Sequence, residues 1–150
     1  QARTLSSEET KDLTQLESIW YEGDIGNDEH YNWTRYYALN LHSVFYRGTV
    51  EWRCFNSTLH AGRAAAYVNL CLAISAQAIA QRSTVMRKTR SDNELFTFRV
   101  WLVRLGLNGD EFKHTRDHLL ANLEGDRAWR YDKDSYEVNR KKKKQREAER

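Results

Sequence analysis

The sequence predicts an α+β fold in which a short antiparallel hairpin packs on one face against several α-helices. Two patterns carry this prediction. From Arg35 to Phe55 the apolar residues alternate with a period of two, which is typical of strands. From Ala64 to Gln81 eighteen residues contain no charge, which predicts a long helix buried on most sides. With 150 residues, 40% of them hydrophobic, the chain is long and apolar enough to form a core.

Shorter helices are expected on both sides of the hairpin. Ser6-Ser7-Glu8-Glu9 resembles a capping box that begins an amphipathic helix, and Gly23 is expected to end it. Ser57 or Thr58 is the expected N-cap of the long helix. Two further stretches with helical periodicity lie on either side of Asn108-Gly109.

The hairpin is predicted to reverse at Arg47-Gly48. A two-residue loop there pairs Tyr46 with Thr49, and it places Asn40 opposite Phe55, Val44 opposite Glu51 and His42 opposite Arg53. Side chains alternate between the two faces of a strand. The apolar face, expected to pack on the long helix, then consists of Leu39, Leu41, Phe45, Val50, Trp52 and Cys54.

The other face of this hairpin is polar and carries Asn40, His42, Glu51 and Arg53. One interpretation is the solvent-exposed side of an antiparallel sheet, with the two charges on the surface. The other is a concave site for anions and a metal ion, because Asn and His are poor formers of exposed strands. Composition does not decide between them.

Charge divides the chain into a globular part, residues 1–130, and a basic polar tail, residues 131–150. The net charge is +3, but residues 140–150 alone carry +5, so the remaining 139 residues carry −2. A nucleic-acid surface spread over the globular part is therefore not indicated, although the tail could contact phosphates. The tail is expected to be a solvated helix or disordered.

Compartment and membrane contact are predicted from composition. Cys54 and Cys71 have no metal-ligand spacing, which predicts reduced cysteines of a cytoplasmic protein. The first residues lack the apolar run of a signal peptide. The uncharged stretch is interrupted by Asn69, Ser75 and Gln77, so it predicts a core helix and no membrane span.

One long run of residues, RYYALNLHSVFYRGTVEWRCFNSTLHAGRAAAYVNLCLAISAQAIAQ, resembles the C-terminal half of the amidoligase family common on phages and mobile elements. LESIWYEG before it and FTFRVWLVRLGLNGDEFKHTRDHLLANLEGDRAWR after it are similar to the same family, so the resemblance spans Leu13 to Arg130. It implies a catalytic fold shared with glutamine synthetase and glutamate-cysteine ligase, of which residues 1–130 would be the C-terminal part.

This resemblance implies an enzyme that uses ATP and Mg²⁺ to join a carboxylate to an amine through an acyl phosphate. The acid would belong to a peptide, a protein or a cell-wall precursor. By the same resemblance Glu51 is the metal ligand and Arg53 stabilises the transferred phosphoryl group. Arg35, Asn40 and His42 are the candidates for nucleotide or substrate contact. The family's Glu-x-Glu strand, which adds metal ligands, is expected upstream of this chain.

The alternative is a non-enzymatic accessory protein of a phage or mobile element that binds nucleic acid through its helices and basic tail. The polar residues of the hairpin distinguish the two functions. A ligase needs Glu51 and Arg53 at a cleft, whereas a nucleic-acid-binding protein leaves them without a role.

Overall fold

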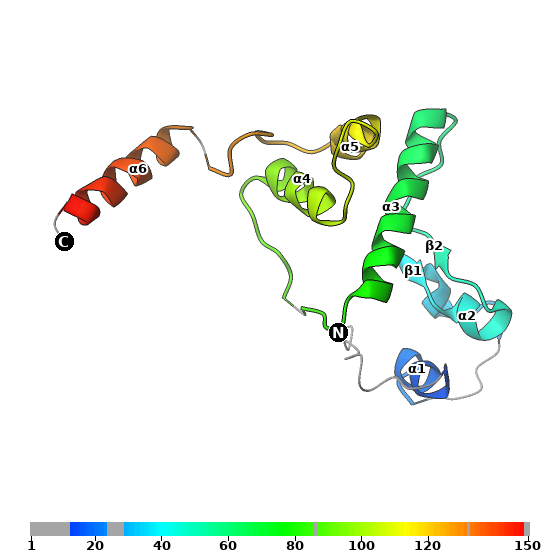
Figure 1. Cartoon of the computed structure of the whole chain (residues 1–150). Helices are drawn as coiled ribbons and strands as arrows, with labels where there is room; N and C mark the ends of the chain where they lie inside the picture. Colours follow the sequence, from blue (N-terminus) through cyan, green and yellow to red (C-terminus); the bar gives the residue numbers. More distant parts are fainter. Residues whose placement is uncertain (1–12, 24–28, 86, 132, 149–150) are drawn as a thin grey trace. The chain divides into compact units, whose positions relative to one another are not determined.

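A computed structural model describes residues 13–23, 29–85, 87–131 and 133–148. The described part is mostly helical and contains one two-stranded antiparallel sheet, so the predicted α+β class is confirmed (Figure 1). In chain order the elements are α1 (Leu13–Trp20), the 3-10 helix η1 (Trp33–Tyr36), β1 (Leu39–Asn40), α2 (His42–Arg47), β2 (Glu51–Trp52), α3 (Ala61–Ala80), α4 (Glu94–Arg104), α5 (Lys113–Leu120) and α6 (Lys133–Ala148).

The chain forms two compact units. The first consists of Gln1–Thr58 and Ala78–Arg87, and the second of Leu59–Gln77 and Lys88–Arg150. The elements from α1 to β2 therefore belong to the first unit, and α4, α5 and α6 belong to the second. Most of α3 belongs to the second unit as well.

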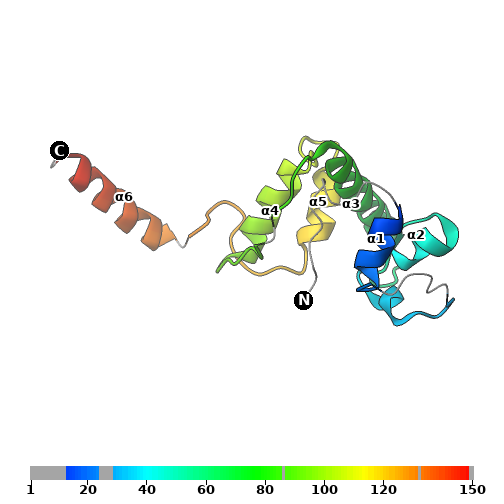
Figure 2. The ribbon, with the colours of Figure 1, turned by 90° about the horizontal axis from the view of Figure 1, so that it is seen from below.

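Polar contacts organise the interior of the first unit. Asn32 caps η1 by accepting a hydrogen bond from the Thr34 backbone N–H, and its Oδ1 also accepts from the Thr34 hydroxyl at 2.7 Å. Trp20 Nε1 donates to the same hydroxyl at 3.0 Å, which joins α1 to η1. α1 also packs on α2, where the Tyr21 ring contacts Phe45 (Figures 1 and 2).

The predicted hairpin turn at Arg47-Gly48 is wrong. Residues from His42 to Arg47 form α2 instead of a strand, and Gly48 ends this helix with a φ of 69°. Its N–H bonds back to the carbonyl groups of Ser43 and Val44. A glycine in the left-handed region is a common end of a helix, so the residue that suggested a strand reversal is a helix terminus.

Because the predicted turn is wrong, the pairing register of the two strands also differs from the predicted one. The structure pairs Asn40 with Glu51 and Leu39 with Trp52, and each strand has only two residues. The predicted partners of Asn40 and Glu51, Phe55 and Val44, are therefore wrong. The apolar face also differs from the prediction, because Val50 is 53% exposed and Cys54 is exposed as well.

Leucine side chains form the interior of the second unit. Leu102 of α4 is fully buried, and Leu95, Leu107 and Leu120 are nearly so. α4 and α5 pack side by side (Figures 1 and 2). Asn93 caps α4 through the Phe96 N–H and donates to the backbone oxygens of Asp126 and Trp129. A single side chain thus connects the start of α4 to the segment after α5.

α3 was predicted to be buried on most sides, and this is wrong. Only Ala66 and Leu70 of its residues are buried, whereas Leu72 is 63% and Ile79 87% exposed. Within the second unit the helix is joined to α5 by a hydrogen bond in which Asn69 Nδ2 donates to Thr115 Oγ1 at 2.9 Å. An apolar pattern shows which side chains could be buried, but not which element covers them.

Among the described residues, α3 is the one helix that is long and apolar enough to cross a membrane by length and composition. Its mean hydropathy over the best window is only 1.2. The helix begins at Ala61, three residues after Thr58 and four after Ser57, and His60 Nδ1 accepts a hydrogen bond from the Arg63 N–H at 3.3 Å.

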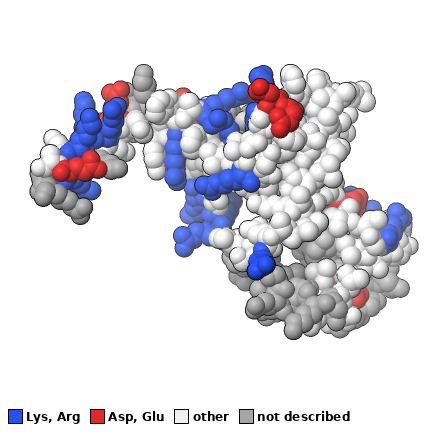
Figure 3. Space-filling view, in the orientation of Figure 1, with Lys and Arg blue, Asp and Glu red and all other residues white. Residues whose placement is uncertain are grey.

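The ends of the chain are only partly described. The predicted capping box at Ser6 to Glu9 lies outside the described residues, but the amphipathic helix expected after it is α1. The basic tail forms α6, whose described side chains are exposed. On the face shown in Figure 3, α6 carries both basic and acidic side chains, and further Lys and Arg side chains lie over α4.

Candidate active site

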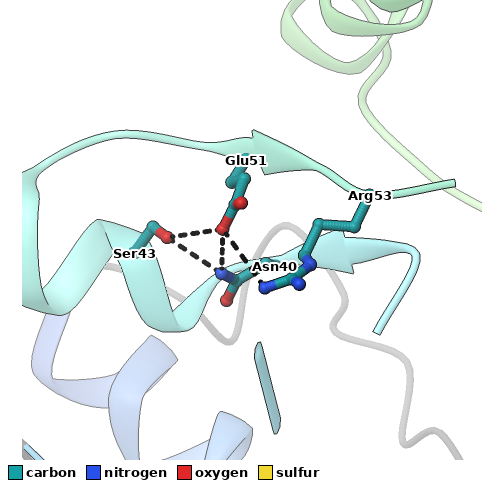
Figure 4. A network of polar contacts seen from close by, with 4 residues as sticks. All are labelled: Asn40, Ser43, Glu51 and Arg53. Carbon is teal, nitrogen blue, oxygen red and sulfur yellow. Dashed lines mark hydrogen bonds and ion pairs between the residues drawn. The ribbon is translucent and has the colours of Figure 1, made fainter. Parts of the chain in front are cut away.

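Glu51, the first residue of β2, lies at the centre of a small polar network (Figure 4). Its partner on the neighbouring strand, Asn40, donates from Nδ2 to Glu51 Oε2 at 2.5 Å. The same Nδ2 lies 2.9 Å from Ser43 Oγ, and that hydroxyl donates to Glu51 Oε2 at 3.3 Å. The strand pair and the first turn of α2 therefore fix one carboxylate oxygen. No described residue hydrogen-bonds to the other oxygen, Oε1.

This network favours the ionised form of Glu51. The Asn40 hydrogen bond is the largest cause that holds the pKa of Glu51 below its ordinary value. Attraction to the Arg53 and Arg35 guanidinium groups and the Ser43 hydrogen bond lower this pKa further, while partial burial opposes them. The side chain is still 48% exposed. The carboxylate is therefore anionic near neutral pH and open to a ligand.

Arg53 lies beside this carboxylate but does not form a hydrogen bond with it. Its NH1 is 3.9 Å from Glu51 Oε2, which is too long for a hydrogen bond, and this buried nitrogen has no hydrogen-bond partner among the described residues. The guanidinium lies 5.4 Å from the centre of the Tyr36 ring. Arg35 lies 5.9 Å from the same ring. Two cations thus share one aromatic side chain next to the acid.

A cavity of about 490 Å³ opens at this network, within the first unit. Its wall combines two arginines, two histidines, the carboxylate and neighbouring polar and aromatic groups. The lining residues include His30, Arg35, Asn40, His42, Ser43, Tyr46, Arg47 and Glu51. This volume lies in the range of small-molecule sites.

His42, the first residue of α2, is 4% exposed and lines the cavity. Its Nδ1 forms a short hydrogen bond with the Tyr21 hydroxyl from the end of α1. Its Nε2 is buried and has no partner in the part of the chain that the structure describes, and the same is true of Asn40 Oδ1. Buried polar atoms without a partner are uncommon in folded proteins, so they mark a place where a ligand could complete the bonding.

All five residues predicted from the sequence lie in the first unit. Arg35, Asn40, His42 and Glu51 line the cavity, and Arg53 is in contact with Glu51. The expected face-to-face pairing of His42 with Arg53 does not occur, because His42 is in a helix. The five predicted residues therefore lie near one another, although the register that positions them differs from the predicted one.

Sequence reasoning missed Ser43, Tyr21 and Tyr36. Ser43 follows Asn40 by three residues, a spacing that brings them together only once α2 is recognised as a helix. Tyr21 is 21 residues from His42, and no local pattern connects them. The described residues contain no group of three or more His, Cys, Asp or Glu side chains that could hold a metal ion by themselves.

This geometry defines a small α+β unit with an acidic and arginine-rich cavity. Residues 1–75, half of the chain, match the family described as "Putative amidoligase enzyme". The chain therefore belongs to this amidoligase family. All five predicted site residues lie within the match, whereas the resemblance seen in the sequence continued to Arg130. No curated protein and no solved structure matches the chain.

Proposed function

We propose that this chain contributes to an ATP-dependent carboxylate-amine ligase that activates its acid substrate as an acyl phosphate. The observation that carries the proposal is the Glu51 carboxylate, held ionised beside two guanidinium groups at a cavity in a chain of the amidoligase family. Residues 1–130 would belong to the catalytic domain, and 131–150 would be a polar tail.

The reaction has two steps. An oxygen of the acid attacks the γ-phosphorus of ATP, the bond to the leaving ADP oxygen breaks, and an acyl phosphate forms. The amine then attacks the acyl carbon, inorganic phosphate leaves, and the amine nitrogen loses a proton. Negative charge accumulates on phosphoryl oxygens in the first step, so cationic and hydrogen-bond donors placed there lower its barrier.

The residues present fit a Mg²⁺ ion. This ion prefers oxygen ligands and keeps several waters, and it neutralises charge on the nucleotide phosphates when bound. Glu51 Oε1 and the buried Asn40 Oδ1 are two oxygens without a described hydrogen-bond partner. Two protein ligands suffice for an ion that takes the rest from water, phosphate and residues outside this chain.

Arg53 is the proposed donor to the transferred phosphoryl group. Its NH1 has no hydrogen-bond partner among the described residues, and its planar fork suits two phosphoryl oxygens. Arg35, on the cavity wall, would bind the remaining phosphates, and His42 would contact nucleotide or substrate. The substrates would be a carboxylate of a peptide, a protein or a cell-wall precursor and an amine, in the cytoplasm.

ADP release in the full-length protein tests this function, with a mixture of candidate acids and amines. Glu51→Gln keeps the shape of the side chain but loses the charge that Mg²⁺ prefers, and Arg53→Lys keeps the charge but loses the fork. Both variants are expected to fold and to lose most ADP release. Glu124→Gln and Arg87→Lys are the controls, because both residues are exposed and neither is among the residues that line the cavity. Unimpaired ADP release in both folded site variants would remove these residues from the mechanism.

A further inference from the structure

Tyr21 and His42 form a buried pair, and His42 lines the site cavity. Tyr21 is 8% and His42 4% exposed, and the phenol hydroxyl forms a hydrogen bond with Nδ1 of the imidazole. Tyr21 directly follows the last residue of α1, and His42 is the first residue of α2. The Tyr21 ring also packs against Phe45 at 5.6 Å between ring centres, which holds the phenol in place.

The direction of this hydrogen bond determines what the other imidazole nitrogen can do. Neutral histidine carries one N–H, so a proton on Nδ1 would make Nε2 an acceptor, and a proton on Nε2 would make it a donor. In the described chain the Tyr21 hydroxyl has no hydrogen-bond partner other than Nδ1. If Nδ1 held the proton, the buried hydroxyl would have nothing to donate to.

The phenol also keeps its proton. Burial is the main cause that raises the pKa of Tyr21, and the nearby Glu17 carboxylate raises it further. At neutral pH the hydroxyl is therefore a donor, and the acceptor available to it is Nδ1. The proton of the neutral imidazole is then on Nε2, the nitrogen for which the described residues provide no partner.

We infer that Tyr21 is a positioning residue of this site: its hydroxyl donates to His42 Nδ1 and so holds the imidazole in the tautomer that presents Nε2–H to an oxygen of an anionic ligand. This inference deepens the proposed function, since it gives His42 the role of a donor to phosphoryl or carboxylate oxygen. Nε2 is covered in the free chain, so the oxygen reaches it after a side chain of the wall moves. Tyr46 stacks on the His42 ring and is 47% exposed, which places it to make that movement.

Nitrogen-15 NMR of the His42 ring tests the tautomer without any ligand or activity. The neutral imidazole of the wild-type protein is expected to show a protonated Nε2 and an unprotonated Nδ1, and added inorganic phosphate is expected to shift Nε2–H in a saturable way. A proton on Nδ1 in the neutral ring would overturn the inference, and so would an Nε2–H that does not respond to phosphate.

A double-mutant cycle separates positioning from simple structural support. Tyr21→Phe is expected to weaken phosphate binding about tenfold, the scale of one hydrogen bond to a charged group. In His42→Gln the amide nitrogen replaces Nε2 and has no tautomer to select, so adding Tyr21→Phe should change binding less than about twofold. Equal losses in both backgrounds would contradict the inference. Tyr37→Phe removes an exposed hydroxyl from the same unit and is the matched control.

A failure of this inference is distinct from a failure of the proposed function. The tautomer and phosphate measurements do not require turnover, whereas ADP release does. A protein that forms ADP normally while its neutral His42 carries the proton on Nδ1 would keep the ligase and reject the role of Tyr21.

Discussion

The two units differ in what they bury. In the second unit the buried residues include five leucines, among them the fully covered Leu102, and two polar residues, Asn93 and Thr115. In the described part of the first unit the buried residues are Tyr21 and four polar residues, namely Asn32, Thr34, Asn40 and His42. A leucine interior stabilises a fold by removing apolar surface from water, whereas a polar interior must satisfy every donor and acceptor.

Not all buried donors and acceptors of the first unit have a hydrogen-bond partner among the described residues. Asn40 Oδ1, His42 Nε2 and Arg53 NH1 are buried atoms without a described hydrogen-bond partner, and they all lie on residues at or next to the site cavity. Proteins often give up stability at functional sites. The difference between the units therefore points to the first as the one that binds a ligand.

Leu102→Ala should show the largest effect on stability. Truncation of this fully buried side chain leaves a cavity in the leucine interior and is expected to lower the free energy of unfolding by about 2 to 5 kcal/mol. Denaturant unfolding measures the loss. Val103→Ala is the control, because Val103 is the next residue of α4 and 39% exposed. Equal effects of the two substitutions would contradict the assignment of the interior.

Asn40→Ala should cost less, although Asn40 is 2% exposed. The substitution removes hydrogen bonds to Glu51 and Ser43, but it also removes a buried oxygen without a partner, so we expect a loss of about 1 kcal/mol. The pKa of Glu51 should rise, because its main cause of depression is lost. Denaturant unfolding and carbon-13 NMR of the carboxyl group measure the two effects. A loss as large as that of Leu102→Ala would remove the contrast between the units.

The pH dependence of this network is a smaller effect. Because folding lowers the pKa of Glu51, the ionised carboxylate stabilises the folded state above the pKa of the unfolded chain. That stabilisation is lost as the pH falls through the lower pKa of the folded state. Thermal melts of wild type and Glu51→Gln should therefore differ more at pH 7 than at pH 3. A difference that grows toward pH 3 would show that the sign is wrong.

Removal of residues 140–150 should have the smallest effect on stability. The described side chains of this part of α6 are exposed, so the thermal midpoint is expected to change by no more than the equivalent of about 0.5 kcal/mol. Binding to nucleic acid, the alternative function, would lose most of its salt dependence with this tail. A large drop in the midpoint would show that the tail docks on the fold.

The sequence predicted the α+β class, the helices on either side of Asn108-Gly109 and the proximity of the polar residues around Glu51, but not how the first unit is built. The alternation that predicted a strand at His42 to Arg47 is equally compatible with a six-residue helix, in which His42 and Tyr46 stack four residues apart. Short segments of this kind are decided by tertiary contacts such as Tyr21 with His42. The exposure of α3 was unpredictable for the same reason, since periodicity does not identify a partner.

Binding of Mg²⁺-ATP to the full-length protein, measured by calorimetry, tests the central claim most directly. Under the proposed function, wild type is expected to bind the nucleotide only with the metal present, because Glu51 would hold an ion that neutralises charge on the phosphates. Glu51→Gln should melt like the wild type at neutral pH within a few degrees and lose this metal-dependent binding, whereas Glu124→Gln should retain it. A folded Glu51→Gln protein that binds Mg²⁺-ATP as tightly as the wild type would contradict the account.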